Sequence, residues 1–260
     1  MLPEPVRLFW SAAIEMAARP VAHPWGYVET DPRYPDVWDA NNASVLSPSK
    51  DLTMHDILRE LRPALSSAGA SREHVEFWET SADFPALSEA RRIGTTERVD
   101  VVMVFDPTSS ISRPGVEVEE VSRPGSDFWP WFRRSLSEFD SPGALDDHVL
   151  DQLVARTREV FVPEGERFFV ATIDGERAGY AGLIRLEGVG YVDNVVTMPQ
   201  YRRRGVASAT MSAAVEASRS SGDEATFLLA DEGGSPAALY ERLGFRVASR
   251  VETLSRPLSE

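Results

Sequence analysis

The chain has no cysteine among its 260 residues. This absence excludes disulfide bonds, thiolate metal sites and a cysteine nucleophile. Histidine is also scarce, and its residues show none of the spacings typical of metal ligands, so we expect no metal site. The four histidines are His23, His55, His74 and His148.

Positive charge is in short supply as well. The formal net charge is -14, and Lys50 is the only lysine. An acidic chain repels the phosphates of nucleic acids and the surface of anionic membranes, so we expect neither as a partner. A cationic, amine-bearing substrate is favoured electrostatically, although acidic charge also serves solubility alone.

Long apolar runs are absent too. No stretch approaches the roughly 18 residues that a membrane-spanning helix needs. The first ten residues lack the basic-then-apolar order of a secretory signal. We therefore expect a cytoplasmic protein without a membrane-spanning helix.

The length allows one large domain or two domains of about 130 residues. Two Arg-Pro-Gly steps, at 113–115 and 123–125, bracket an alternating run that predicts a strand at 116–121. The stretch before the first step is polar and rich in turn residues. We place a domain boundary there, which predicts one domain at 1–110 and another at 111–260.

Periodicity beyond the boundary predicts an ordered series of elements. Strands are expected at 116–121, 166–173, 177–186, 190–198 and 225–230, with final strands in 245–253. Helices are expected at 127–138, 145–160, 205–220 and 236–243, the first two separated by Ser141-Pro142-Gly143. Asp174-Gly175 predicts a two-residue hairpin, and Glu187-Gly188 predicts another tight turn.

The N-terminal domain has a similar but weaker pattern. Short strands are expected near 27–28 and within 35–46, and helices at 53–67 and 83–92. Thr53 is a good helix start, and strands are expected at 74–79 and 96–105. The resulting order, strand-helix-strand-helix-strand, is that of the second half of the C-terminal domain, without a direct sequence repeat.

The strongest pattern runs from a strand, through a basic loop, into a helix. The strand ends at Pro199, three consecutive arginines follow, and the helix begins at Gly205. Gly205 lets the backbone approach a ligand closely, and Ala207 is nearly as small. Amides at a helix start have no partner within the helix, and together with the helix dipole they bind anions such as a pyrophosphate. The arginines are Arg202, Arg203 and Arg204.

Two segments resemble the GNAT superfamily of acyl-CoA-dependent N-acetyltransferases. Residues 202–207 read Arg-Arg-Arg-Gly-Val-Ala and match the family's Arg/Gln-x-x-Gly-x-Gly/Ala signature. The preceding Val-x-x-Pro-x-Tyr framing also fits. Residues 239–245 read Leu-Tyr-Glu-Arg-Leu-Gly-Phe and are similar to the family's C-terminal helix. The resemblance extends over residues 116–256.

The resemblance implies an α/β (α+β) fold, in which helices flank a central, mixed and mostly antiparallel sheet. It also implies acetyl-CoA as the co-substrate. The pantetheine arm is expected between two splayed strands, 190–198 and 225–230, at a β-bulge, with the Val196 N–H as the oxyanion donor. The expected cofactor contacts are Val195, Val196, Thr197, Arg202, Arg203, Arg204, Gly205, Val206, Ala207, Ser208 and Ser235.

The resemblance also implies residues for the proton transfers. An alkyl amine titrates near ~10 and must lose a proton before it attacks a thioester. Asp193 lies where many relatives carry a basic carboxylate, and Asp231, Glu232 or water competes for that role. Tyr240 matches the tyrosine that protonates the departing thiolate in many relatives. The alternatives are a strand-end hydrogen bond for Asp193 and helix packing for Tyr240.

One position departs from the family pattern. Many relatives have an asparagine about seven residues before the tyrosine, where this chain has Gly233, and Ser235 is expected to replace that contact. An aromatic cluster in the helix at 127–138 either lines the acceptor pocket or packs the core. Its members are Phe128, Trp129, Trp131 and Phe132.

The N-terminal domain lacks the Arg-x-x-Gly-x-Gly/Ala signature, so the chain resembles a tandem GNAT protein with a degenerate first unit. Within this unit, Asn41 and Asn42 are expected either to form a turn or to face the acceptor site. The sequence predicts an acetyltransferase acting on the primary amine of a small molecule or amino-acid-like substrate. A non-catalytic acyl-CoA sensor and a protein acetyltransferase are the alternatives. The acceptor and the oligomeric state, monomer or homodimer, are left open.

Overall fold

The computed structural model describes residues 1–80, 83–93, 98–109, 115–138 and 145–258. The chain forms two compact units. Unit 1 comprises Met1–Val102, Ala230–Gly234 and Val247–Glu260, and unit 2 comprises Met103–Leu229 and Ser235–Arg246. The predicted breaks at 113–114 and 141–143 lie outside the described residues. Among the described residues, no helix has both the length and the apolar character to cross a membrane.

This division differs from the boundary expected at residue 110. The chain leaves unit 1 within β5 (Arg98–Phe105), and its last segment returns to unit 1. The return is made by β11 (Phe245–Pro257), which pairs antiparallel with β4 (Arg72–Phe77) from Glu252 to Pro257. β11 is one strand of 13 residues, not the two that we expected, because no glycine, proline, asparagine or aspartate interrupts 246–256.

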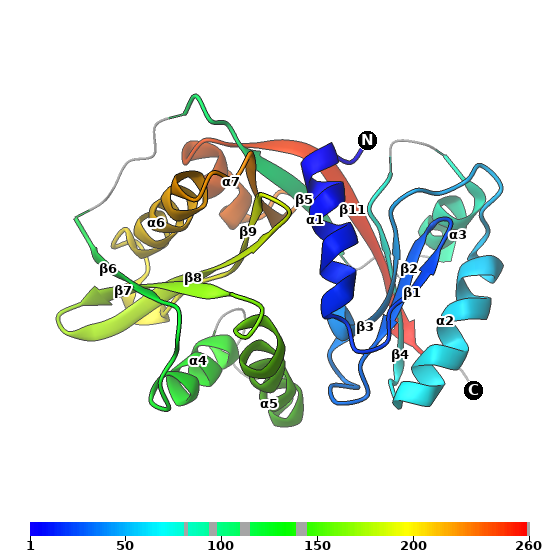
Figure 1. Ribbon diagram of the computed structural model, residues 1–260, viewed down its shortest axis with the longest axis horizontal. Helices are drawn as coiled ribbons and strands as arrows, with labels where there is room; N and C mark the ends of the chain where they lie inside the picture. Colours follow the sequence, from blue (N-terminus) through cyan, green and yellow to red (C-terminus); the bar gives the residue numbers. More distant parts are fainter. Residues whose placement is uncertain (81–82, 94–97, 110–114, 139–144, 259–260) are drawn as a thin grey trace. The chain divides into compact units, whose positions relative to one another are not determined.

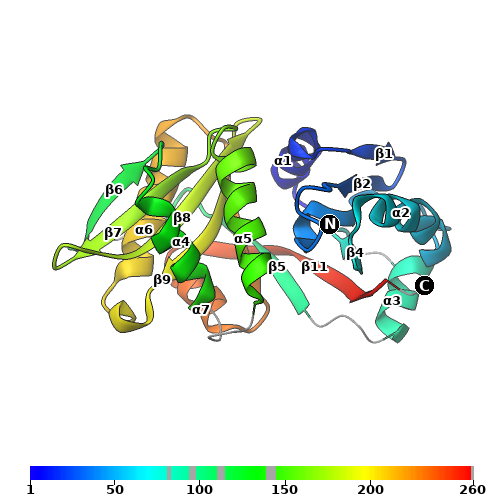
Figure 2. The same cartoon turned by 90° about the horizontal axis from the view of Figure 1, so that it is seen from below.

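Unit 2 is built on a mixed sheet. β9 and β10 are parallel, and the other neighbouring pairs are antiparallel, which confirms the expected mostly antiparallel arrangement. Figure 2 shows β6 to β9 side by side. The sheet order is β10 (Ala225–Asp231), β9 (Val189–Thr197), β8 (Glu176–Leu186), β7 (Arg167–Ile173) and β6 (Glu117–Val121).

Tight turns join the antiparallel strands of unit 2. Asp174 and Gly175 have φ values of 54° and 84°, and Glu187 and Gly188 have φ values of 51° and 69°. Positive φ at both central residues is the requirement of the two-residue hairpin turn that matches strand twist. Both predicted turns are therefore confirmed.

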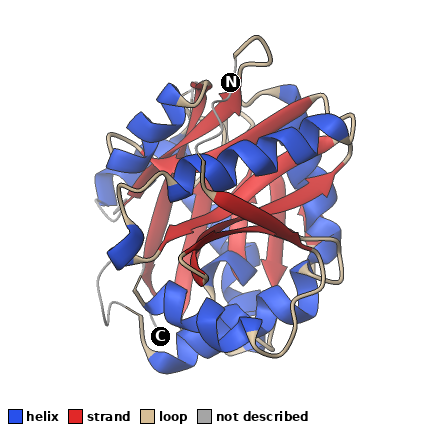
Figure 3. Ribbon diagram, turned by 90° about the vertical axis from the view of Figure 1, so that its left-hand side faces the viewer, coloured by secondary structure: helices blue, strands red, loops and turns tan. Residues whose placement is uncertain are grey.

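Helices cover both faces of this sheet (Figures 1 and 3). On one face, Phe128 and Phe132 of α4 (Phe128–Ser137) pack on Phe168, Tyr180 and Val196 of the strands. On the other face, Val206 of α6 packs on Ala171 and Ala178. The helices of this unit are α4, α5 (Asp147–Arg156), which continues into a π-helical turn at Thr157–Phe161, α6 (Val206–Ser220) and α7 (Ser235–Arg242).

Gly179 allows α6 to lie close against the sheet. A Cβ atom at this position would lie 2.3 Å from the Val196 carbonyl oxygen and 2.7 Å from Cγ1 of Val206. We expect Gly179→Ala to lower the free energy of unfolding by about 1–3 kcal/mol, because the added methyl group would have to displace the backbone of β9 or the start of α6. Gly115→Ala, where a Cβ meets nothing within 4 Å, is the control in a denaturant titration. Equal stability of the two variants would contradict this packing.

Unit 1 repeats the strand-helix-strand arrangement. β3 and β4 are parallel and are connected by α2, just as β9 and β10 are connected by α6. The sheet order in this unit is β1-β2-β3-β4-β11. Its remaining elements are α1 (Glu4–Ala13), β1 (Val21–His23), β2 (Gly26–Thr30), β3 (Asn41–Val45), α2 (Met54–Ala68) and α3 (Pro85–Ile93). Of these, α1 and β1 were not predicted.

The core of unit 1 lies under α2. Its buried face, Ile57, Leu61 and Leu65, packs with Val75 and Phe77 of β4 and with Leu254 of β11, among others. This is the apolar helix face that the sequence predicts, and Thr53 begins the helix as expected.

Candidate active site

The expected bulge is present in β9. Tyr180 of β8 lies opposite Val196, but Gly182 lies opposite Asp193, so β9 carries one extra residue between the two pairs. Asn194, within that interval, has φ 49°. Asparagine is among the few residues that adopt this left-handed conformation readily. The bulge therefore has a local sequence cause.

The parallel strands part beside this bulge. In the described chain, the pairing of β9 with β10 runs from Val189–Ala225 to Val192–Leu228. β9 continues from Asp193 to Thr197 beyond the last pair. The strand segment with the three expected pantetheine contacts, 195–197, thus lies beyond the end of the pairing with β10.

The start of α6 follows directly. Gly205 is the N-cap residue with φ 83° and ψ 4°, and no side chain caps the helix. Arg202, Arg203 and Arg204 are exposed on the preceding turn, while Ala207 and Ser208 are half-buried. Arg204 pairs with Asp174 at 3.4 Å. The structure thus brings the expected basic loop and an uncapped helix start next to the end of β9.

The start of α2 in unit 1 is different. The Thr53 side chain accepts a hydrogen bond from the Asp56 amide, and the Asp56 carboxylate accepts one from the Thr53 amide. These hydrogen bonds lower the pKa of Asp56. A negative charge and two satisfied amides therefore occupy the position that an anion would need.

Asp193 and Tyr240 lie within electrostatic range of each other. Asp193 accepts hydrogen bonds from the Tyr191 hydroxyl at 3.3 Å and from the Asn194 amide at 2.8 Å. Tyr240, on α7, is buried, and burial together with the Asp193 charge raises its pKa to about 12. The phenol therefore keeps its proton at neutral pH, as a general acid must.

The other candidate residues, between the end of β10 and the start of α7, are exposed, unlike Tyr240. Ser235 is exposed at the first residue of the helix, and Gly233 occupies a turn with φ 74°. Asp231 is exposed at the end of β10. Glu232 is also exposed and forms an ion pair with Arg250 at 2.5 Å.

The aromatic cluster divides into two pairs. Phe128 and Phe132 are buried and stack on each other at 5.7 Å, so they belong to the core. Trp129 and Trp131 are half-buried. Trp131 contacts the Tyr180 ring edge-on at 5.4 Å. Within this cluster, only the two tryptophans have exposed surface that a substrate could contact.

Asn41 and Asn42 serve the local structure of unit 1. The Asn41 side chain donates to the carbonyls of Tyr34 and Val37 and accepts from the Asp31 amide. Asn42 donates to Glu29 at 2.7 Å. Both residues are the first two of β3 and not the turn that we expected, and their side chains hold the loop that precedes this strand.

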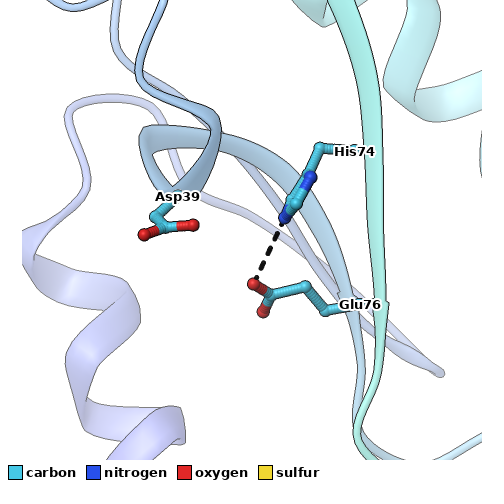
Figure 4. A group of neighbouring side chains, drawn as sticks. All are labelled: Asp39, His74 and Glu76. Atoms are coloured by element: carbon cyan, nitrogen blue, oxygen red, sulfur yellow. Dashed lines mark ion pairs between the residues drawn. The ribbon is translucent and has the colours of Figure 1, made fainter. Parts of the chain in front are cut away.

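One polar cluster in unit 1 has the composition of a metal site. Asp39, His74 and Glu76 place one ligand atom each within 4.8 Å of one another (Figure 4). Burial opposes the charge on His74, but the hydrogen bond and charge of Glu76 outweigh it and raise the pKa of the imidazole. Glu76 also accepts hydrogen bonds from Ser44 and Trp78. A buried His74–Glu76 ion pair accounts for this arrangement.

Sequence reasoning missed Glu166, which begins the segment leading into β7. It is fully buried, and among the described residues neither carboxyl oxygen has a hydrogen-bond partner. Burial, and then the charge of Asp193, raises its pKa well above the ordinary value. It follows Pro163-Glu164-Gly165 and was expected only as the first residue of the strand at 166–173, so no local signal marked its burial.

Comparisons with known proteins bear on the family and the fold. Residues 126–245 match the Acetyltransferase (GNAT) family. No curated protein matches the chain. A GCN5-related N-acetyltransferase from Kribbella flavida has a similar structure, with a TM-score of 0.69 and 17% identity over 99% of this chain and 97% of that one.

Two further structures share the fold over both units. A functionally unknown conserved protein from Staphylococcus epidermidis has a TM-score of 0.69 and 12% identity, over 92% of this chain and 93% of that one. A tandem GNAT protein from the clavulanic acid biosynthesis pathway has a TM-score of 0.57 and 14% identity, over 84% and 76% of the two chains. Residues 126–245 of this chain therefore match the Acetyltransferase (GNAT) family, and over both units the chain is similar to these proteins in fold.

Proposed function

We propose that unit 2 binds acetyl-CoA and transfers its acetyl group to the primary amine of a small, amino-acid-like acceptor. The observation that carries this proposal is the parting of β9 from β10 at a bulge, next to the uncapped start of α6. We assign the pantetheine to the backbone of Val195, Val196 and Thr197. The pyrophosphate is assigned to the amides at Gly205–Ser208 and to the three arginines before them, and Ser235 supplies a further contact.

The residues present can perform the proton transfers of a direct attack. Asp193 takes a proton from the acceptor ammonium, and the neutral nitrogen then forms a bond to the thioester carbonyl carbon. The Val196 amide stabilises the negative charge on the carbonyl oxygen. The carbon–sulfur bond breaks, and Tyr240 donates its proton to the departing sulfur. The resulting phenolate takes the second proton that the nitrogen loses as it becomes an amide, which restores Tyr240. The net charge of -14 favours a cationic acceptor and disfavours nucleic acids and anionic membranes as partners.

We also propose that unit 1 is a degenerate GNAT-like unit that does not bind coenzyme A. The repeated strand-helix-strand arrangement supports the common pattern. The capping box and the ionised Asp56 at the start of α2 oppose a bound pyrophosphate.

Calorimetry on the full chain tests the cofactor assignment. We expect one molecule of coenzyme A per chain, bound at least about tenfold more tightly than ADP, because the pantetheine amides add hydrogen bonds worth about 1 kcal/mol each. The full chain is required, because β11 belongs to both units. Absence of binding by folded protein would contradict the assignment.

A screen of amines with a thiol-release assay then tests the reaction. We expect release of one thiol for each amine acetylated. If coenzyme A binds but no amine is turned over, the result favours a non-catalytic acyl-CoA sensor. Turnover with lysine-rich proteins alone would favour a protein acetyltransferase.

A further inference from the structure

Two other buried carboxylates in the described chain, Glu73 and Asp223, are paired with arginine. Glu73, fully buried, pairs with Arg62 and Arg256. Asp223, with no exposed side-chain surface, accepts two hydrogen bonds from Arg185. Such pairing is the usual condition for burying a charge. Glu166 departs from this pattern, because its oxygens have no hydrogen-bond partner among the described residues.

The position of Glu166 is fixed by its surroundings. Its amide donates to the Phe161 carbonyl at 2.9 Å, which ties it to the turn after α5. Its side chain extends over Gly182 of β8, where a Cβ atom would lie 2.7 Å from Oε1 of Glu166. The same Cβ would lie 3.2 Å from the Asp193 carbonyl oxygen. The missing side chain at Gly182 thus leaves room for a carboxyl beside the bulge.

The groups that act on Glu166 come from several elements. Asp193 of β9 is the charge that influences it, and the charges of both carboxyls also reach Tyr180 of β8. The charge of Asp193 also acts on Tyr240 of α7, where it adds to the effect of burial in raising the pKa. Arg167, its neighbour on β7, is turned to Glu120 on β6 at 3.0 Å. Within the part of the chain that the structure describes, no cation offsets the burial of Glu166, whereas the charge of Asp193 acts on it.

We propose that Glu166 is the buried member of a carboxyl pair with Asp193, and that this pair, rather than Asp193 alone, accepts the proton of the acceptor's ammonium group. The inference rests on the proposed acetyltransferase function. Asp193 is half-exposed and contacts the amine, and Glu166 acts through it as a positioning residue. One proton moves from the ammonium nitrogen to the doubly ionised pair, which is then singly protonated. That proton leaves to solvent before the next turnover.

A role in proton transfer explains why the site holds a buried carboxyl, Glu166, that has no hydrogen-bond partner among the described residues. Two interacting carboxyls lose their protons in two steps that belong to the pair. Like charge and burial move the second step upward, toward the pH at which a general base is most effective. An amine that arrives as a cation is attracted to the charge that this step creates.

The test uses Glu166→Gln in the full chain, with Glu164→Gln as the matched control at an exposed position two residues away. For an amine found in the screen, we expect the wild-type kcat/KM to rise with pH through the upper step. In Glu166→Gln, kcat/KM should no longer rise through this step, and turnover at neutral pH should be about tenfold slower. The affinity for coenzyme A should be unchanged. An unchanged pH profile in a folded Glu166→Gln protein would overturn the proposal.

A second readout does not depend on activity. Because the pKa of Glu166 is raised in the folded protein, its contribution to stability is present below about pH 4.3 and is lost as pH rises toward the folded pKa. Between about pH 4.3 and the folded pKa, the melting temperature of Glu166→Gln should therefore exceed that of the wild type by a margin that grows as the pH rises. Asp193→Asn should reduce this difference, since it removes the neighbouring charge. Strictly additive effects of the two substitutions would refute the pair even if no amine were ever acetylated.

Discussion

Replacing Tyr240 with phenylalanine should lower turnover about 10²–10⁴-fold, the usual effect of losing a positioned general acid. The substitution keeps the ring, which packs near Phe245 with centroids 6.2 Å apart, and removes only the hydroxyl. Coenzyme A affinity should remain the same, since the assigned contacts lie on β9, around the start of α6 and at Ser235, and none of them is the Tyr240 hydroxyl. Turnover with the screened amine and calorimetry on the same protein measure both quantities.

The control for this substitution is Tyr27→Phe, a buried tyrosine of β2 in unit 1. It removes a hydroxyl from a core without touching the proposed site. If Tyr240→Phe turns over amine at the wild-type rate, the hydroxyl is not the proton donor and Tyr240 is a packing residue. If Tyr240→Phe lowers turnover only in proportion to a lower melting temperature, Tyr240 is likewise a packing residue.

The raised pKa of Tyr240 also has consequences for the pH dependence of stability and turnover. Burial and the charge of Asp193 raise its pKa to about 12, so the neutral phenol is favoured in the folded protein. Its contribution to stability is present below about pH 10 and is lost as pH rises through the folded value. Tyr240 therefore stays protonated over the range in which an amine acceptor is deprotonated. The rising limb of the pH profile belongs to another group, which directs attention to Asp193 and Glu166.

The sequence predicted those features that depend on neighbours in the chain. Thr53 begins a helix because its side chain caps the amide three residues later, and Asp174-Gly175 forms a turn through its own backbone preferences. The basic loop and the uncapped start of α6 are likewise local, since arginines and Gly205 occupy one short segment.

Features that depend on distant parts of the chain were not predicted. The return of β11 to β4 joins residues about 180 positions apart, and no local pattern encodes such pairing. The burial of Glu166 requires the missing side chain at Gly182, which only the strand register brings beneath it. Asp193 and Tyr240 were predicted individually, but their electrostatic contact depends on how α7 packs within unit 2.

Replacing Gly205 with valine should weaken coenzyme A binding at least about 100-fold, which corresponds to roughly 2.7 kcal/mol. Two physical effects combine. At φ 83° a β-branched residue is strained by about 1–3 kcal/mol, so the turn changes and the amides at the start of α6 lose their direction. The added side chain also stands where the backbone must approach the pyrophosphate.

Strain and contact can be separated with Gly222→Val. Gly222 has the same φ of 83°, follows the other end of α6, and a Cβ there meets nothing within 4 Å. Both variants should lose similar stability in thermal unfolding, whereas only Gly205→Val should lose coenzyme A affinity. Equal affinity in the two variants would show that the α6 start does not hold the cofactor. Because the control carries the same backbone strain on the same helix, a selective loss of affinity at Gly205 locates the pyrophosphate at the helix start and not merely within unit 2.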